Sequence, residues 1–175
     1  STGVIGQQLP MDKITRGIQL VTDTLHADGG HDAAQAIMTT DTVPKEIAVE
    51  IEIGGKIVRI GGMTKGSGMI APSMATMLAF LTTDVKIANE PLQTALRQSV
   101  DKSFNRVTID TDRSTNDTVQ ILATGSAGNP EITEASGDDY DAFYKGLEFV
   151  CIELAKKIAR DGEGATKMIE VVVKN

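Results

Sequence analysis

The sequence predicts a mixed fold, either α+β or layered α/β, and two hydrophobic periods carry this prediction. Residues 47–53 alternate apolar and polar side chains, which is typical of a half-buried strand. Residues 141–160 place apolar side chains three and four positions apart, which is typical of an amphipathic helix. Strand and helix patterns of these kinds interleave along the chain, and this mixed order favours layers of sheet and helix.

The first elements are predicted to be helices, after a start (STGVIGQQLP) that indicates a loop or short strand. Pro10 suits a first helical turn, and a helical stripe follows at Met11, Ile14, Ile18, Val21 and Leu25. HADGGHD (26–32) ends this helix, and residues 33–37 indicate a second, short one. A β-hairpin is expected next, because Gly54-Gly55 is a two-residue turn between strand 47–53 and the segment KIVRI (56–60).

The second half is predicted to start with an irregular loop over residues 61–73 and a buried strand over residues 77–84. Pro91 opens a further helix, and strands are expected at 107–110 and 118–125, on either side of a polar loop. A long helix runs from about Asp141 to Arg160, with its apolar stripe at Phe143, Leu147, Val150, Leu154 and Ile158. Residues 167–175 (KMIEVVVKN) indicate a last strand.

Composition excludes several classes of partner. The 175 residues suit one domain or two tightly fused lobes, and 41% of them are hydrophobic, so a globular fold is expected. The net charge is -7 and aromatic residues are only 3%, which argues against a nucleic-acid partner. No apolar run approaches the length of a membrane span, and Cys151 is the single cysteine, which fits a reducing compartment such as the cytoplasm.

Common catalytic and binding motifs are absent from the sequence. Neither a nucleotide-binding glycine motif nor CxxC nor GxSxG occurs. His26 and His31 lie close to Asp28 and Asp32, but their spacing matches no ligand motif, so we expect a solvated loop and no metal. Cys151 lies between apolar neighbours on the predicted long helix, and we expect it to be a buried, unreactive thiol.

Thr76 is the remaining candidate nucleophile. A threonine that becomes the first residue of a chain can use its own α-amine as the base, since the reference pKa of that amine is about 7.7 to 8.0. To reach this state, the Thr76 hydroxyl attacks the Ala75 carbonyl, an N-to-O shift gives an ester, and water releases the upstream piece. The small Ala75 and the Gly/Pro-rich loop before it suit such a step. From the residues alone, an ordinary threonine at the start of a strand remains the simpler interpretation.

Longer motifs favour the interpretation of Thr76 as a nucleophile. KGSGMIAPSMATML (65–78) resembles the self-processing site of the ornithine acetyltransferase family, the bifunctional glutamate N-acetyltransferases of arginine biosynthesis. STGVIGQQLPMDKI, AIMTTDTVPK, DTDRSTNDT and DGEGATKMIEV also resemble segments of that family, in the same order along the whole chain. The resemblance implies cleavage between Ala75 and Thr76, so that 1–75 is the end of an α chain and 76–175 the start of a β chain. It also implies a layered αββα sandwich of the N-terminal-nucleophile-like, ornithine acetyltransferase/DmpA-like kind.

The resemblance implies a ping-pong acetyl transfer in cyclic arginine biosynthesis. Thr76 takes the acetyl group of N-acetylornithine and releases ornithine, and glutamate then accepts the acetyl group from Thr76. Some family members also use acetyl-CoA as donor, so acetyl-CoA stays open as a further substrate, and no cofactor is expected.

The resemblance also assigns further site residues by position. Thr2 and Gly3 match the pair that stabilises the oxyanion, through a hydroxyl and a backbone N–H. One substrate-binding position matches Lys65, whose charge suits the α-carboxylate of a substrate. A second matches one threonine of MTTD, for which we favour Thr39 over Thr40. A third matches Glu163, which suits the amine end of ornithine.

The family's polypeptide extends beyond this chain on both sides, so we expect 1–175 to be an incomplete segment of one catalytic domain. The expected partners are the remaining α and β segments, in an α2β2 heterotetramer. Two alternatives stay open. One is a self-processing aminopeptidase or amidohydrolase of related fold, in which water replaces glutamate. The other is an inactive structural or regulatory fragment.

Overall fold

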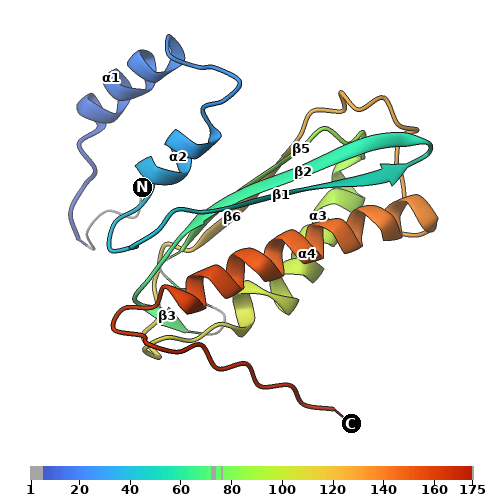
Figure 1. The fold of residues 1–175 in the computed structure, drawn as a ribbon. Coiled ribbons are helices and arrows are strands. Elements are labelled where there is room, and N and C mark those ends of the chain that lie inside the picture. The colour runs from blue at the N-terminus through green and yellow to red at the C-terminus, as the bar shows by residue number, and fades with distance from the viewer. Residues whose placement is uncertain (1–5, 72–73, 76, 175) are drawn as a thin grey trace.

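A four-stranded sheet forms the centre of the protein. The computed structural model describes residues 6–71, 74–75 and 77–174, and Figure 1 shows their arrangement. The sheet has the order β1-β2-β5-β6, in which β5 and β6 are parallel and the other neighbours are antiparallel. Its strands are β1 (Lys45–Ile53), β2 (Lys56–Lys65), β5 (Leu78–Thr83) and β6 (Thr118–Ala123). A second, two-stranded sheet pairs β3 (Ile70–Ala71) with β4 (Met74–Ala75).

The predicted hairpin is confirmed as β1 and β2. Gly54 and Gly55 have φ angles of 55° and 72°, which is the left-handed conformation that a two-residue hairpin turn requires. The predicted loop over residues 61–73 is wrong at residues 61–65, where β2 continues, and at Ile70–Ala71, which form β3. Residues 60–64 pair with β1 on one side and with β5 on the other, so their backbone groups find partners on both sides, and Lys65 pairs with β5 alone.

Two helices cover one face of this sheet (Figure 1). They are α3 (Asn89–Lys102), followed by the single turn η1 (Phe104–Arg106), and α4 (Asp138–Arg160). All five residues of the predicted α4 stripe are buried against the sheet and α3. The helix begins three residues before the predicted start, where Asp138 and Asp139 add negative charge to the first turn. As the crossover between β5 and β6, α3 allows these two strands to be parallel.

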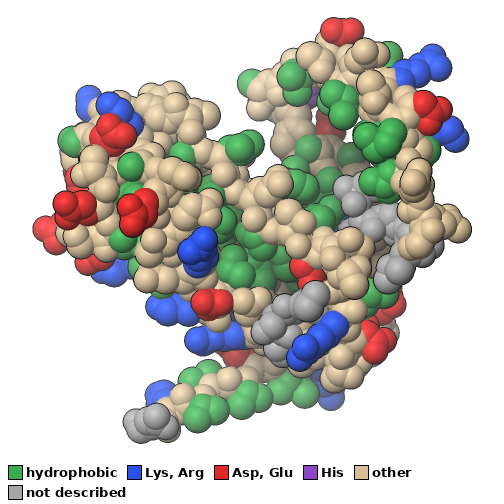
Figure 2. Space-filling view, turned by 180° about the vertical axis from the view of Figure 1, so that it is seen from behind, with side chains coloured by type: hydrophobic (Ala, Val, Ile, Leu, Met, Phe, Trp, Pro, Cys, Tyr) green, Lys and Arg blue, Asp and Glu red, His purple; other side chains and the backbone are tan. Residues whose placement is uncertain are grey.

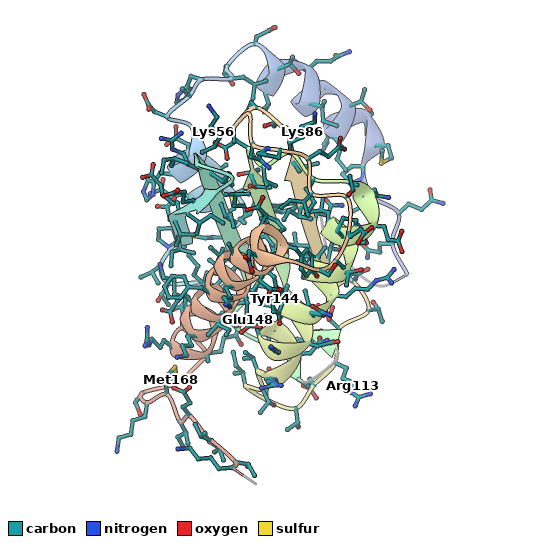
Figure 3. All side chains as sticks on the ribbon, turned by 90° about the vertical axis from the view of Figure 1, so that its right-hand side faces the viewer. Lys56, Lys86, Arg113, Tyr144, Glu148 and Met168 are labelled. Atoms are coloured by element: carbon teal, nitrogen blue, oxygen red, sulfur yellow. The ribbon has the colours of Figure 1, made fainter. Side chains whose placement is uncertain are left out.

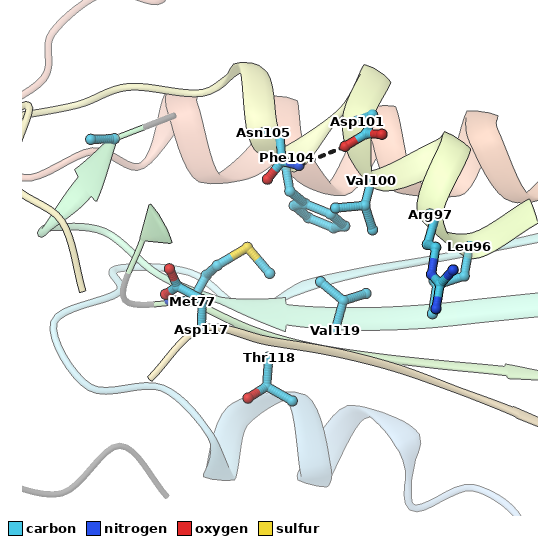
Figure 4. A pocket seen from close by; sticks show the side chains of 11 residues that line it. Met77, Leu96, Arg97, Val100, Asp101, Phe104, Asn105, Asp117, Thr118 and Val119 are labelled. Atoms are coloured by element: carbon cyan, nitrogen blue, oxygen red, sulfur yellow. Dashed lines mark hydrogen bonds between the residues drawn. The ribbon is translucent and has the colours of Figure 1, made fainter. Parts of the chain in front are cut away.

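The N-terminal helices lie apart from this core. Both predicted helices are confirmed, as α1 (Met11–Thr22) and α2 (Gly30–Ala36), but α1 ends before Leu25 and buries none of its residues. α2 begins inside the predicted break, so His31 and Asp32 lie on a helix and not in a loop. α2 contacts β1 and β2 from the side opposite α3 and α4 (Figure 4). Between α2 and the sheet is a cavity of about 430 Å³ lined in part by Ala48, Met63 and Phe80. Figure 2, seen from behind the view of Figure 1, shows hydrophobic side chains gathered near the middle of that face.

Two predicted strands are wrong. Residues 107–110 are irregular, because Asp110 turns its carboxylate back onto the Met69 and Ile70 N–H groups instead of continuing a ladder. Residues 168–174 pair with no strand in the described part of the chain, and Ile169 and Val173 are 84% and 85% exposed. Figure 3 shows Met168 just beyond α4, from where the chain runs away from the sheet. An apolar, β-branched run therefore predicts a strand only where a ladder partner exists.

Across the described ranges, no helix combines the length and the apolar character that crossing a bilayer demands.

Candidate functional site

Lys65 and Thr39, two of the predicted substrate-binding residues, are in contact. Lys65 is the last residue of β2 and is only 4% exposed, and its Nζ donates a hydrogen bond to the Thr39 Oγ1 at 2.9 Å. Among the described residues, no carboxylate forms an ion pair with this ammonium group. A buried cation of this kind favours an anionic ligand, because burial without a counter-charge is costly.

Asp41 fixes the two segments that carry this contact. Its carboxylate accepts hydrogen bonds from the Thr39 N–H at 3.1 Å, the Gly66 N–H at 2.7 Å and the Lys45 ammonium at 2.6 Å. Burial by itself raises the pKa of Asp41, but these three donors outweigh burial and hold the pKa below its usual value. The carboxylate is therefore ionised at neutral pH, and it sets the backbone positions beside both Thr39 and Lys65.

Lys45 connects Asp41 to the end of α4. Its side chain is 0% exposed, and its Nζ also lies 2.5 Å from Asp161 Oδ2, directly after the helix. Asp161 in turn accepts the Thr42 N–H at 2.9 Å. Burial opposes the ionisation of Asp161, but Lys45 and Thr42 lower its pKa overall. This ionic cluster of Asp41, Lys45 and Asp161 joins the chain before β1, the end of β2 and the end of α4.

Glu163 lies beside the predicted processing segment. Its backbone N–H donates to the Ser67 carbonyl at 2.8 Å, and the Ser67 hydroxyl donates to the Asp161 carbonyl at 2.6 Å. The Glu163 carboxylate lies so close to Gly68 that a Cβ there would come within 2.7 Å of it. The structure thus brings Lys65, Thr39 and Glu163 to one region, although they are far apart in sequence.

The loop before the predicted cleavage position contains a strained residue. Met69 has a φ of 56°, which is unusual for a residue with a side chain. Asp110 holds this conformation by accepting the Met69 and Ile70 N–H groups at 2.5 Å and 3.0 Å. After β3 the chain returns, so that Ile70 pairs with Ala75. Thr76, Thr2 and Gly3 lie outside the described residues, and their predicted roles, like the cleavage at Ala75, stay predictions.

Asp117 is a residue of the site region to which the sequence alone assigned no role. Its Oδ1 accepts the N–H of Met77, the residue after Thr76, at 2.9 Å. Its Oδ2 is buried without a hydrogen-bond partner among the described residues. Burial raises the pKa of Asp117 to about 6, against the opposing effects of the Met77 N–H and the Lys65 charge. The sequence signals for it were its place directly before a predicted strand and its place in DTDRSTNDT, one of the segments that resemble the family.

Asp117 and Met77 lie together at one end of a cavity of about 500 Å³ (Figure 4). α3, β5 and β6 form its walls, with Val100, Phe104 and Val119 as apolar lining. Arg97 and Asp101 are the charged side chains that α3 contributes to it. The cavity thus adjoins the start of β5.

Two other sequence candidates lie elsewhere. Cys151 is fully buried, which confirms the prediction of a buried thiol, and burial raises its pKa to about 12. The exposed His31 ring lies 2.5 Å from the Glu46 carboxylate, and His26 lies 3.7 Å from Asp32. Within the described residues, no group of three His, Cys, Asp or Glu side chains is arranged to hold a metal ion.

Comparison with known proteins gives matches along the whole chain. The model of the ArgJ family matches residues 1–175. The arginine biosynthesis bifunctional protein ArgJ of Symbiobacterium thermophilum is 58% identical over 174 residues, which cover 99% of this chain and 43% of that protein. The protein of the same description from Bacillus licheniformis is 56% identical over 173 residues, with 99% and 42% covered.

The chain therefore spans well under half the length of these relatives. Among solved structures, the crystal structure of the arginine biosynthesis bifunctional protein argJ from Bacillus halodurans shares 50% sequence identity with it. That superposition covers 50% of this chain and 41% of the other, with a TM-score of 0.48.

Proposed function

Because this chain belongs to the ArgJ family, we propose that it is part of an acetyltransferase that moves an acetyl group from N-acetylornithine to glutamate. The relatives that it matches are described as bifunctional proteins of arginine biosynthesis. In the structure, the observation that carries the proposal is the buried Lys65 ammonium, held by Thr39 beside the segment that contains Thr76. A cation there suits the α-carboxylate that N-acetylornithine and glutamate share.

The proposed reaction has two half-reactions on Thr76. Self-cleavage after Ala75 frees the Thr76 α-amine, which takes the proton from the Thr76 hydroxyl as Oγ attacks the acetyl carbonyl of N-acetylornithine. The bond between the acetyl carbon and the ornithine nitrogen then breaks, and ornithine leaves with that proton. The amine of glutamate attacks the acetyl-Thr76 ester, and Oγ recovers a proton as N-acetylglutamate departs.

The remaining predicted residues have supporting roles in this proposal. The Thr2 hydroxyl and the Gly3 N–H stabilise the oxyanion of each tetrahedral intermediate. The Glu163 carboxylate attracts the side-chain amine of ornithine, and its place against Gly68 supports this role. Acetyl-CoA is a second acetyl donor to be tested, and the reaction as written requires no cofactor.

The proposed assembly needs the rest of the polypeptide. The segments that precede and follow residues 1–175 in the relatives complete an αββα sandwich of the N-terminal-nucleophile kind, and two copies of each chain form an α2β2 heterotetramer in the cytoplasm. Cleavage divides the present segment into 1–75 and 76–175. The helix layer of α3 and α4 on one face of the sheet is in keeping with one half of such a sandwich.

The test uses the full-length protein and N-acetylornithine without glutamate. We expect an acetyl group on the piece that begins with Thr76, and we expect T76A to lose both self-cleavage and acetyl transfer. Ornithine release without an acetylated Thr76, at a rate independent of glutamate, would favour the amidohydrolase instead. Acetyl transfer by T76A would contradict the proposal, and a protein that neither cleaves nor reacts would indicate a structural role.

A further inference from the structure

Asp117 accepts a hydrogen bond from the backbone N–H of Met77, the residue that follows the proposed nucleophile Thr76. We propose that Asp117 is a positioning residue whose Oδ2 accepts a hydrogen bond from the α-amine of Thr76 and holds this amine against the Thr76 hydroxyl. This inference rests on the proposed function, since the free amine exists only after cleavage at Ala75.

Covalent geometry brings the two groups within reach. Asp117 Oδ1 accepts the Met77 N–H at 2.9 Å, so the carboxylate is fixed to the backbone nitrogen directly after Thr76. The nitrogens of consecutive residues are joined by three bonds, and standard bond lengths keep them within roughly 3.7 Å of each other. Covalent connectivity alone therefore keeps the Thr76 amine within a few ångströms of the nitrogen that Asp117 holds.

The second carboxylate oxygen is the one that is free for this role. Oδ2 is buried and has no hydrogen-bond partner among the described residues. A buried carboxylate oxygen left without a donor is costly, so such an oxygen next to a catalytic segment indicates a partner that is acquired later. Cleavage supplies that partner, because it turns one amide N–H into an amine with additional protons.

The electrostatic surroundings agree with this order of events. Burial disfavours the charged form of Asp117 before cleavage, and a nearby ammonium group stabilises a buried carboxylate. The other charged groups around it are Lys65 at the end of β2, which favours its ionisation, and Arg97 and Asp101 on α3, which line the same cavity. Of these three charges, only that of Lys65 affects the pKa of Asp117, and it lowers this pKa.

This contact has a consequence for the reaction. The amine must accept a proton from the Thr76 hydroxyl, and a carboxylate beside it stabilises the ammonium group that forms. The same contact raises the pKa of the amine, so it moves the acid limb of the pH–rate profile to higher pH. A group that only supported the fold would leave the position of that limb unchanged.

The experiment compares D117N, D117E and D112N with wild type in the full-length protein. The D117N side chain is isosteric with that of wild type and retains an oxygen for the Met77 N–H, whereas Asp112 is an exposed residue of the same segment and controls for the loss of one negative charge. We expect D117N to self-cleave, to lose about tenfold or more in kcat, and to move the acid-limb midpoint of kcat/KM down by about one pH unit. D117E should restore the midpoint, and D112N should match wild type.

Three results would overturn the proposal. The first is a D117N acid limb that coincides with that of wild type. The second is a folded D117N protein that does not cleave itself, because the proposed partner of Asp117 is formed only after cleavage. The third is failure of both D117N and D117E to fold, which would assign Asp117 a structural role. Failure of the proposed function is separate, since it appears as a wild-type protein that forms no acetyl-Thr76.

Discussion

Replacing Lys45 by methionine tests whether the ionic cluster of Asp41, Lys45 and Asp161 organises the site. The Lys45 side chain is fully buried, with Nζ 2.6 Å from Asp41 and 2.5 Å from Asp161. K45M keeps most of the buried volume but leaves two carboxylates without their shared cation. Removing one partner of a buried ion pair typically costs about 3–5 kcal/mol, and we expect K45M to lose stability in this range.

The assay is urea unfolding followed by far-ultraviolet circular dichroism, with K86M as the matched control. Lys86 pairs with Glu131 at 3.8 Å on the surface, so K86M should cost less than about 1 kcal/mol. The pKa values of Asp41 and Asp161 are lowered from 3.8, so the stability that the cluster provides is present above this pH and is lost as pH falls below it. The difference between K45M and wild type should therefore shrink below pH 3.8. A K45M cost no larger than that of K86M at neutral pH would refute the reasoning.

Three further predictions concern single contacts. G68A puts a methyl group 2.7 Å from the flexible Glu163 carboxylate, so it should cost less than about 1 kcal/mol in stability but raise the KM for N-acetylornithine, and an unchanged KM would contradict the placement of Glu163. Cys151, with its pKa raised to about 12, should resist iodoacetamide at about pH 8 until the protein is unfolded, and rapid labelling of the native protein would show that it is accessible. In the uncleaved T76A protein, the pKa of Asp117 is raised from 3.8 to about 6, so ionisation over that range destabilises the fold. T76A/D117N should consequently become more stable than T76A as pH rises from about 4 to 6, and parallel stability curves would contradict the burial of this carboxylate.

Elements with a strong local pattern were predictable from the sequence. The hairpin followed from alternation on both sides of Gly54-Gly55, and α4 followed from an apolar stripe that is entirely buried. The strands β3 and β4 are two residues each, too short to show any period, so the irregular loop was the only available prediction. Residues 167–175 have a strand's composition, but pairing is a tertiary property that composition does not contain.

The candidate site was predictable only in part, for a similar reason. The motif around Thr76 and its resemblance to a family pointed to Lys65, Thr39 and Glu163, and the structure brings these residues to one region. The contact between Lys45 and Asp161 joins residues 116 positions apart, and no local pattern reveals a contact of that range. Asp117 was missed because its importance depends on the Met77 N–H and on burial.

The mass of the full-length protein after incubation with N-acetylornithine tests the central claim most directly. We predict two pieces divided between Ala75 and Thr76, with one acetyl group on the piece that begins with Thr76, and we predict that this acetyl group is lost when glutamate is added. A protein that transfers the acetyl group while residues 75 and 76 remain joined, or that carries the acetyl group on another residue, would contradict this claim.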